Sequence, residues 1–194
     1  NGITTSKSSN ANFNTNYYYD GGNETTFNID ANFGRYTREN NSFTPNLYTN
    51  PEGSDITSRF EVRSITPTTI DILSVKMDYE RKLGTGKISG GIKSAMVSTD
   101  NTFNFYNITG SSETLNSNLS NRFKYDERVN AAYLNYNIQI KKIGINGGIR
   151  VENSHTKGDL IAMNAANNKV VERDYTNVFP SLGVSYAHSQ KHSF

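Results

Sequence analysis

The stretch TPTTIDILSVKMDYE, residues 66–80, alternates two kinds of side chain. The apolar set is Leu73, Val75, Met77 and Tyr79. The residues between them, such as Lys76 and Asp78, are mostly polar or charged. Successive side chains of a strand point to opposite faces, so this period of two predicts a β-strand with one apolar face and one polar face.

The composition favours strands over helices. The chain has 194 residues, a net charge of +2, 34% hydrophobic residues, 11% aromatic residues and no cysteine. So small a net charge gives no strong field toward nucleic acid or acidic lipid, and the absence of cysteine removes disulfides and Cys-ligated metals. No apolar stripe of helical period runs longer than two turns. The sequence therefore predicts an all-β fold, with residues 1–194 as a single domain.

Six further segments repeat the alternation of the opening stretch, whose own strand covers about 68–80. They span about 9–19, 24–37, 87–99, 123–140, 143–154 and 174–187. Short turns are predicted at DGGN (20–23), RKLGTG (81–86), KK (141–142) and HSQKH (188–192). They alternate with longer polar stretches at 38–67, 100–122 and 155–173, the first of which holds a candidate short strand at 58–64. About seven strands joined in this rhythm predict an up-and-down antiparallel meander with one plain end and one elaborated end.

Two interpretations of the two-faced strands compete. A soluble antiparallel sheet also alternates apolar and polar residues, and the chain would then be a cell-surface binding module, for example for carbohydrate. Long strands, the alternation of short and long connections, and Tyr19, Tyr79 and Tyr186 beside short turns favour a transmembrane barrel with an interfacial aromatic girdle. Arg35 and Asp71 share the apolar parity, but both are expected at the long-loop end, where a membrane tolerates charge.

The polar face would line the lumen of such a barrel. The candidate lumen-facing residues are Lys76, Asp78, Lys93, Asn135, Arg150 and Glu152. Arg150 and Glu152 are either a ligand-contacting or plug-contacting pair or, as we favour, part of an ordinary charge ladder. The stretch NTFNFYNITGSS supplies Phe103, Phe105 and Tyr106 as candidate loop contacts for a sugar or peptide.

The sequence shows no convincing pattern for covalent chemistry. His155 begins a predicted loop without an accompanying Asp or Glu pattern that would suggest acid–base catalysis. We therefore predict no enzyme activity, no catalytic residue, no metal and no cofactor. Pro180 falls inside the predicted strand 174–187 and cannot donate a hydrogen bond to a ladder, so we expect a local bulge there.

Four segments resemble the outer-membrane β-barrel domain of a Bacteroidetes family related to TonB-dependent receptors. They are TPTTIDILSVKMDYE, NAAYLNYN, GIRVENSHTKG and DYTNVFPSLGVSY, and the resemblance runs in order from about Phe27 to Ala187. It implies a location in the cell outer membrane, a barrel of about 22 strands around an N-terminal plug, and energised solute uptake through TonB, a periplasmic partner.

Residues 1–194 depart from that pattern, since we find no plug, signal peptide or TonB-contacting segment in them. About seven strands predict a slice of a barrel with two free edges. Its expected partners are membrane lipid and the remaining strands and plug of the parent protein, with no nucleic acid. For the isolated slice we expect the edges to be buried, either by curling into a closed or two-layered sheet or by pairing with a second copy. Strand patterning does not encode the ligand.

Overall fold

The structure is a computed structural model that describes residues 2–22, 24–189 and 192–193. Its strands are β1 (Ile3–Asp20), β2 (Thr26–Thr49), β3 (Ile56–Leu83), β4 (Gly86–Thr109), β5 (Ser112–Leu115), β6 (Asn121–Ile140), β7 (Ile143–Ala162), β8 (Lys169–Ser189) and β9 (His192–Ser193). A short 3-10 helix, η1 (Ala165–Asn167), precedes β8. In the described part of the chain, no helix has the length and apolar character needed to cross a membrane.

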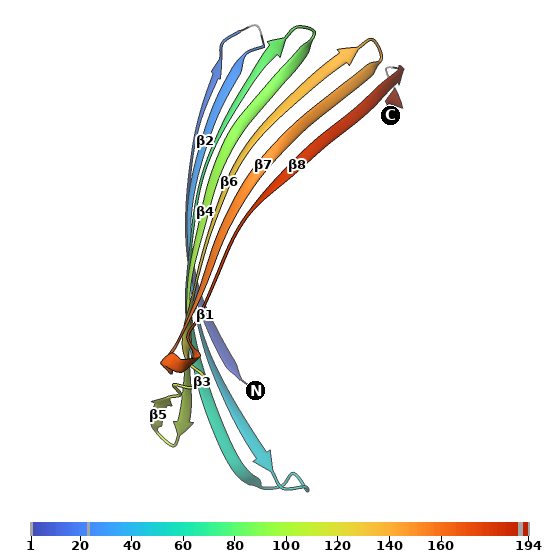
Figure 1. The fold of residues 1–194 in the computed structure, drawn as a ribbon. Helices are drawn as coiled ribbons and strands as arrows, with labels where there is room; N and C mark the ends of the chain where they lie inside the picture. The colour runs from blue at the N-terminus through green and yellow to red at the C-terminus, as the bar shows by residue number, and fades with distance from the viewer. Residues whose placement is uncertain (1, 23, 190–191, 194) are drawn as a thin grey trace.

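The seven predicted strands are all present, as β1 to β4 and β6 to β8, and they form the predicted antiparallel meander (Figure 1). The short β5 pairs only with the end of β4, and β9 pairs with the end of β8. Every long strand pairs with the next long strand along the chain, in the order β1-β2-β3-β4-β6-β7-β8. Sequence order and spatial order therefore coincide.

The prediction of long loops at one end of the sheet is wrong. β2 and β3 stay paired from Thr26↔Glu80 out to Thr49↔Ile56, so only residues 50–55 connect them, and the candidate strand 58–64 is part of β3. β3 has 28 residues, which is about 90 Å at roughly 3.3 Å per residue. The parts of β2 and β3 that extend beyond the predicted strands are largely polar on both faces. They therefore lack the alternation of a half-apolar strand, although their backbones still pair.

The short turns at the other end are confirmed at 21–25, 84–85 and 141–142. In the two-residue turns, Gly84 has a φ of 64° and Lys141 a φ of 54°. Positive φ at this place is typical of the hairpin turns whose twist matches that of the flanking strands. The expected fourth turn, HSQKH, includes residues 190–191, which lie outside the described residues.

The expected closure of the isolated slice is wrong. β1 and β8 do not pair with each other, and the sheet is one open, curved layer (Figure 1). The ladder between β2 and β3 shifts register only near Tyr48 and Thr49, and no shift interrupts those of β1–β2, β3–β4, β4–β6, β6–β7 or β7–β8. Closure of a barrel depends on strand number together with strand tilt and stagger, and this gently curved section has too few strands for its edges to meet.

The bulge expected at Pro180 is also wrong. Pro180 lies opposite Ile149, and the β7–β8 register runs through this pair without a shift. In the described residues only the two-residue β9 lies beyond β8, so Pro180 is on an edge strand, where sheets tolerate proline.

Near Phe105, the partner of β4 changes from β6 to β5. Asn121 pairs with Phe103, whereas Leu115 pairs with Tyr106. The side chain of Ser120, only 2% exposed, fills this junction, and its Oγ accepts a hydrogen bond of 2.9 Å from the backbone N–H of Phe105. Ser120 thus satisfies a backbone donor that neither neighbouring strand reaches.

Replacing Ser120 with Ala should loosen this junction by about 1–3 kcal/mol, because the Phe105 amide would lose its acceptor while staying buried. Hydrogen exchange of the Phe105 amide should accelerate by about tenfold or more. Ser117→Ala changes an exposed serine of the same loop and is the matched control. Equal exchange rates in the two variants would contradict the role given to Ser120.

The sheet has almost no core. Among the described residues, Ala131 is the only hydrophobic residue classed as buried, at 6% exposure. Large apolar side chains are exposed instead, including Leu182 at 79% and Phe13 at 67%. A soluble domain of this length hides most such side chains. The fold therefore leaves an apolar surface that this chain does not cover.

Candidate functional site: an apolar belt and a polar wall

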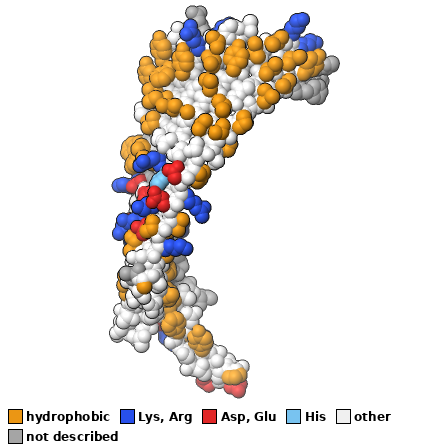
Figure 2. Space-filling model, viewed as in Figure 1, with side chains coloured by type: hydrophobic (Ala, Val, Ile, Leu, Met, Phe, Trp, Pro, Cys, Tyr) orange, Lys and Arg blue, Asp and Glu red, His pale blue; other side chains and the backbone are white. Residues whose placement is uncertain are grey.

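The apolar side chains gather on one face of the sheet, over the half nearest the short turns (Figure 2). We call this surface the apolar belt. It comprises Phe27, Ile29 and Phe33 of β2, Leu73, Val75, Met77 and Tyr79 of β3, Ile88, Ile92 and Met96 of β4, Ala132, Leu134, Tyr136 and Ile138 of β6, Ile145, Ile149 and Val151 of β7, and Val178, Leu182, Val184 and Tyr186 of β8. Register places all of them on one face, as the parity of the sequence predicts.

The belt has the height of a bilayer core. On β3 it is bounded by Asp71 and Arg81, which leaves nine residues between these charges. A transmembrane β-strand needs about 9–11 residues. The remainder of β3, from Ile56 to Ile70, extends past the belt on one side.

Charged residues lie on the same face as the belt, on its side away from the short turns, and Figure 2 shows them gathered next to the apolar side chains. This charged border consists of Arg35, Asp71, Asp100, Arg122, Lys124, Asp126, Arg128, His155, Lys157, Asp159, Glu172 and Asp174. Arg35 and Asp71, predicted to lie here, are directly opposite each other and form an ion pair of 2.6 Å. Pairing lowers the cost of holding these charges beside an apolar surface.

His155 also belongs to this border, although sequence reasoning assigned it no partner. Its ring nitrogens lie 3.4 Å from Asp174 and 3.6 Å from Glu172, both on the neighbouring strand β8. Asp174 is 19 residues and Glu172 is 17 residues away in sequence, so only the strand register could have revealed the contact.

Aromatic residues mark the opposite limit of the belt. Tyr19, Tyr79 and Tyr186 are exposed at the short-turn ends of β1, β3 and β8, where the sequence places them. Tyr136 lies over Gly86, where an added Cβ would come within 2.5 Å of its hydroxyl oxygen, and that hydroxyl donates to the Leu83 carbonyl at 3.2 Å. Rings at this depth match the girdles at membrane interfaces.

The other face of the sheet is a polar wall, and the six candidate lumen-facing residues all lie on it. Two adjacent rows of paired residues bring five of them together. One row contains Lys76, Lys93 and Glu152, and the next contains Asp78 and Arg150, while Asn135 lies one row further toward the short turns.

Ion pairs on this wall run both along strands and between them. Lys76 contacts Asp78 at 2.7 Å, and Arg150 contacts Glu152 at 2.6 Å. Both pairs join residues two apart on one strand, whereas Glu80 of β3 and Lys87 of β4 form a pair of 2.9 Å across neighbouring strands of the same wall. Lys76 also lies directly opposite Lys93, a like-charge arrangement that the bond to Asp78 offsets.

A contact that sequence reasoning missed crosses three strands of the wall. The Tyr133 hydroxyl of β6 donates to the Asp78 carboxylate of β3, and its side chain passes over Gly91 of β4. An added Cβ at Gly91 would lie 2.5 Å from the Met77 carbonyl oxygen and 2.7 Å from the Tyr133 hydroxyl oxygen. Gly91 therefore provides the space that lets Tyr133 reach Asp78.

Asparagines form a second network on the wall, between β1 and β2. The Asn14 amide donates to Asp30 at 3.1 Å and to Asn32 at 2.6 Å, while Asn16 donates to Asn28 at 2.8 Å. All of these side chains are on the face opposite the apolar belt. The wall thus offers a water-facing surface of amides and paired charges.

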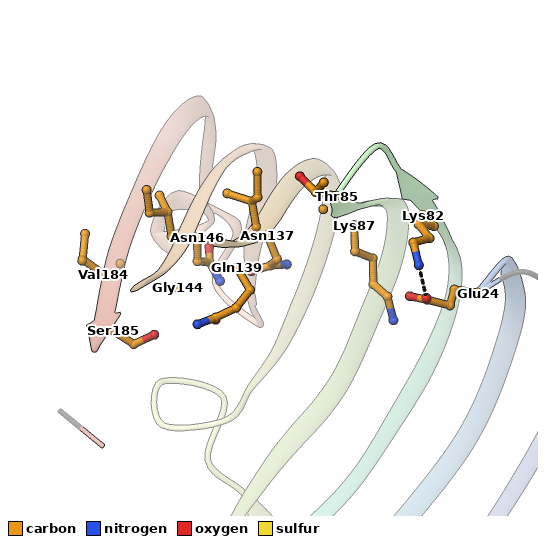
Figure 3. Close-up of a pocket in the computed structure, with 14 residues that line it drawn as sticks. Glu24, Lys82, Thr85, Lys87, Asn137, Gln139, Gly144, Asn146, Val184 and Ser185 are labelled. Atoms are coloured by element: carbon orange, nitrogen blue, oxygen red, sulfur yellow. Dashed lines mark hydrogen bonds and ion pairs between the residues drawn. The ribbon is translucent and has the colours of Figure 1, made fainter. Parts of the chain in front are cut away.

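At the short-turn end, the wall holds a recess of about 670 Å³. Lys87, Asn137, Asn146 and Gln139 are among the side chains that line it (Figure 3). Near one side, Lys82 donates a hydrogen bond of 2.9 Å to Glu24 of the β1–β2 turn. This hydrogen bond, together with the positive charge of Lys82, lowers the pKa of Glu24.

The candidate loop contacts are not in a loop. Phe103, Phe105 and Tyr106 lie within β4, because that strand continues to Thr109. Alternation puts Phe103 and Phe105 on the polar wall, with ring centroids 6.1 Å apart, and Tyr106 on the opposite face. The three residues therefore do not form one contact surface.

Comparison with known proteins agrees with this geometry. A model of the "Outer membrane protein beta-barrel family" matches residues 20–194. Among solved structures, the chain is similar to the ferric-catecholate import receptor Fiu from E. coli K12, with a TM-score of 0.64 and 17% identity over 95% of this chain and 34% of that one. It is also similar to the siderophore receptor PiuA from Acinetobacter baumannii, with a TM-score of 0.63 and 13% identity over 95% of this chain and 31% of that one.

No curated protein matches the chain. The chain spans about a third of the length of the two receptors. At these identities the structural likeness concerns the fold alone: a section of a large antiparallel barrel.

Proposed function

The chain belongs to the outer membrane protein β-barrel family, and on that basis we propose that it forms a section of the wall of an outer-membrane receptor or transporter for solute uptake. The observation that carries the proposal is the apolar belt, which is exposed, about as high as a bilayer core, and bounded by charges on one side and tyrosines on the other. Lipid covers the belt in the assembled protein.

The polar wall then faces the lumen. Lys76, Lys93, Asp78, Arg150 and Glu152 form a patch on it at the level of the belt. In that position they contact the solute, water or a plug. Because their charges are mostly paired within strands, they act as a hydrated surface without covalent chemistry, in keeping with the receptors that share the fold.

The edges β1 and β8 pair with further strands of the parent barrel. In the described residues, the outer side of β1 has no neighbour and that of β8 has only β9, so both offer backbone donors and acceptors to another strand. A plug inside the completed barrel and TonB on the periplasmic side complete the uptake machinery. In the isolated chain, the same edges favour self-association.

Fractionation of cells that express the full-length gene tests the proposal. The protein should be found in the outer membrane and should resist extraction by salt and carbonate. Recovery in the soluble periplasm would support the alternative, a soluble cell-surface binding module, and would reject the barrel.

A further inference from the structure

At the level of the charged border, but on the opposite face, the polar wall contains a groove of about 520 Å³ across β6, β7 and β8. We call it the inner groove. Its residues form three rows of paired positions, Phe123–Leu160–Lys169, Tyr125–Gly158–Val171 and Glu127–Thr156–Arg173, with Tyr175 next along β8. Because β7 is the middle strand, this chain supplies both sides of the groove.

The central row makes a slot with apolar sides. Tyr125 and Val171 lie on either side of Gly158, two strand spacings or about 9–10 Å apart. Gly158 has no side chain to fill the floor, and an added Cβ would contact the Phe123 ring at 3.4 Å. The Phe123 and Tyr175 side chains are 38% and 47% exposed, so their rings are available to a ligand. A planar ring fits this slot and these neighbours.

The charges of the groove favour an anion. Lys169 and Arg173 make no ion pair with any described residue, although Arg and Lys elsewhere on the sheet are often paired. The groove has one carboxylate, that of Glu127, beside these two positive charges. Arg173 is one row from the slot, about 7 Å along β8 from Val171. Its guanidinium is suited to bidentate binding of a carboxylate or similar acid group.

We propose that the inner groove binds an anionic solute with a planar aromatic ring, the ring entering the slot over Gly158 and the acid group reaching Arg173. This inference rests on the proposed function, since the groove meets solutes only if the polar wall faces a lumen. Its volume falls within the range of about 300–1,000 Å³ that is usual for small-molecule sites.

Binding of 2-naphthoate to the full-length protein, purified in detergent, tests the inference. Equilibrium dialysis should show weaker binding of 2-naphthalenemethanol, which has the ring without the charge, and of hexanoate, which has the charge without the ring. Arg173→Gln should weaken 2-naphthoate binding about tenfold, in line with a lost charge-assisted hydrogen bond. Gly158→Val should abolish it by filling the slot.

Lys142→Gln is the matched control, because it also removes one exposed positive charge but lies in the β6–β7 turn. Circular dichroism checks that each variant is folded. If Gly158→Val does not fold, Arg173→Gln still tests the inference, because it changes only an exposed side chain of β8. An unchanged dissociation constant in Arg173→Gln, or equal binding of 2-naphthoate and the neutral alcohol, overturns the inference. Equilibrium dialysis uses the purified protein, whichever cell fraction it was recovered from. A failure of the proposed outer-membrane location is therefore seen in the fractionation experiment and is distinguished from a failure of ligand binding.

Discussion

Val75→Arg should destabilise the membrane-inserted protein by about 2–4 kcal/mol. Val75 is in the middle of the apolar stretch of β3, four residues from Asp71 and six from Arg81, so the guanidinium cannot reach either interface without distortion. Urea unfolding of the full-length barrel in lipid vesicles, monitored by circular dichroism, measures the decrease in the free energy of unfolding.

Ser74→Arg is the control, because it introduces the same side chain one residue away, on the polar wall. Its cost should be small, since that face meets water. Leu73→Arg should fall between the two, because it is two residues from Asp71 and near the interface, where an arginine costs about 0–1 kcal/mol. Equal losses for Val75→Arg and Ser74→Arg would refute contact between the belt and lipid.

Gly91→Ala should cost about 1–3 kcal/mol, the usual penalty for overpacking. The added Cβ would lie 2.5 Å from a backbone oxygen, that of Met77, so β3 and β4 must move apart. The Tyr133 hydroxyl, 2.7 Å from the same point, must also leave its position over Gly91, which weakens its bond to Asp78. Urea unfolding gives the free-energy change, and the Tyr133 ultraviolet absorbance reports the altered hydroxyl environment.

Gly147→Ala is the matched control on β7, since an added Cβ there meets nothing within 4 Å. It should be neutral or slightly stabilising, because alanine restricts the unfolded chain more than glycine does. If Gly147→Ala destabilises the protein as much as Gly91→Ala, the effect comes from strand propensity, and the close approach of Tyr133 is not its cause.

The sequence predicts the belt well because the belt is a local property. Alternation over nine or more residues, as at Leu73 to Tyr79, places side chains on faces without any knowledge of partners. The same test fails at 38–67, where Thr, Ser and Asn occupy both faces although β2 and β3 continue. Pairing without an apolar face leaves no periodic signal, so the sequence of these strand extensions is indistinguishable from that of polar loops.

Contacts on the polar wall are less predictable, because they depend on register between strands. Parity alone places Asp78 and Arg150 on one face, but it does not show that Tyr133 lies between them and bonds to Asp78. The glycines that allow such contacts are equally ambiguous in sequence: Gly91 is overlain by a tyrosine, whereas Gly147 faces open space. The inner groove was missed for the same reason, since its rows join residues from three strands.

The uncovered side of β1 has a consequence for how the protein enters the bilayer. This strand has 18 residues, and in hydrocarbon each backbone group without a hydrogen-bond partner costs several kcal/mol. The belt-level portion of β1 therefore cannot enter lipid ahead of the strand that pairs with it, and the same holds for β8. Membrane integration of this section is consequently cooperative with its neighbours: a barrel lacking one flanking strand should stall before insertion, and a partially integrated intermediate should not accumulate.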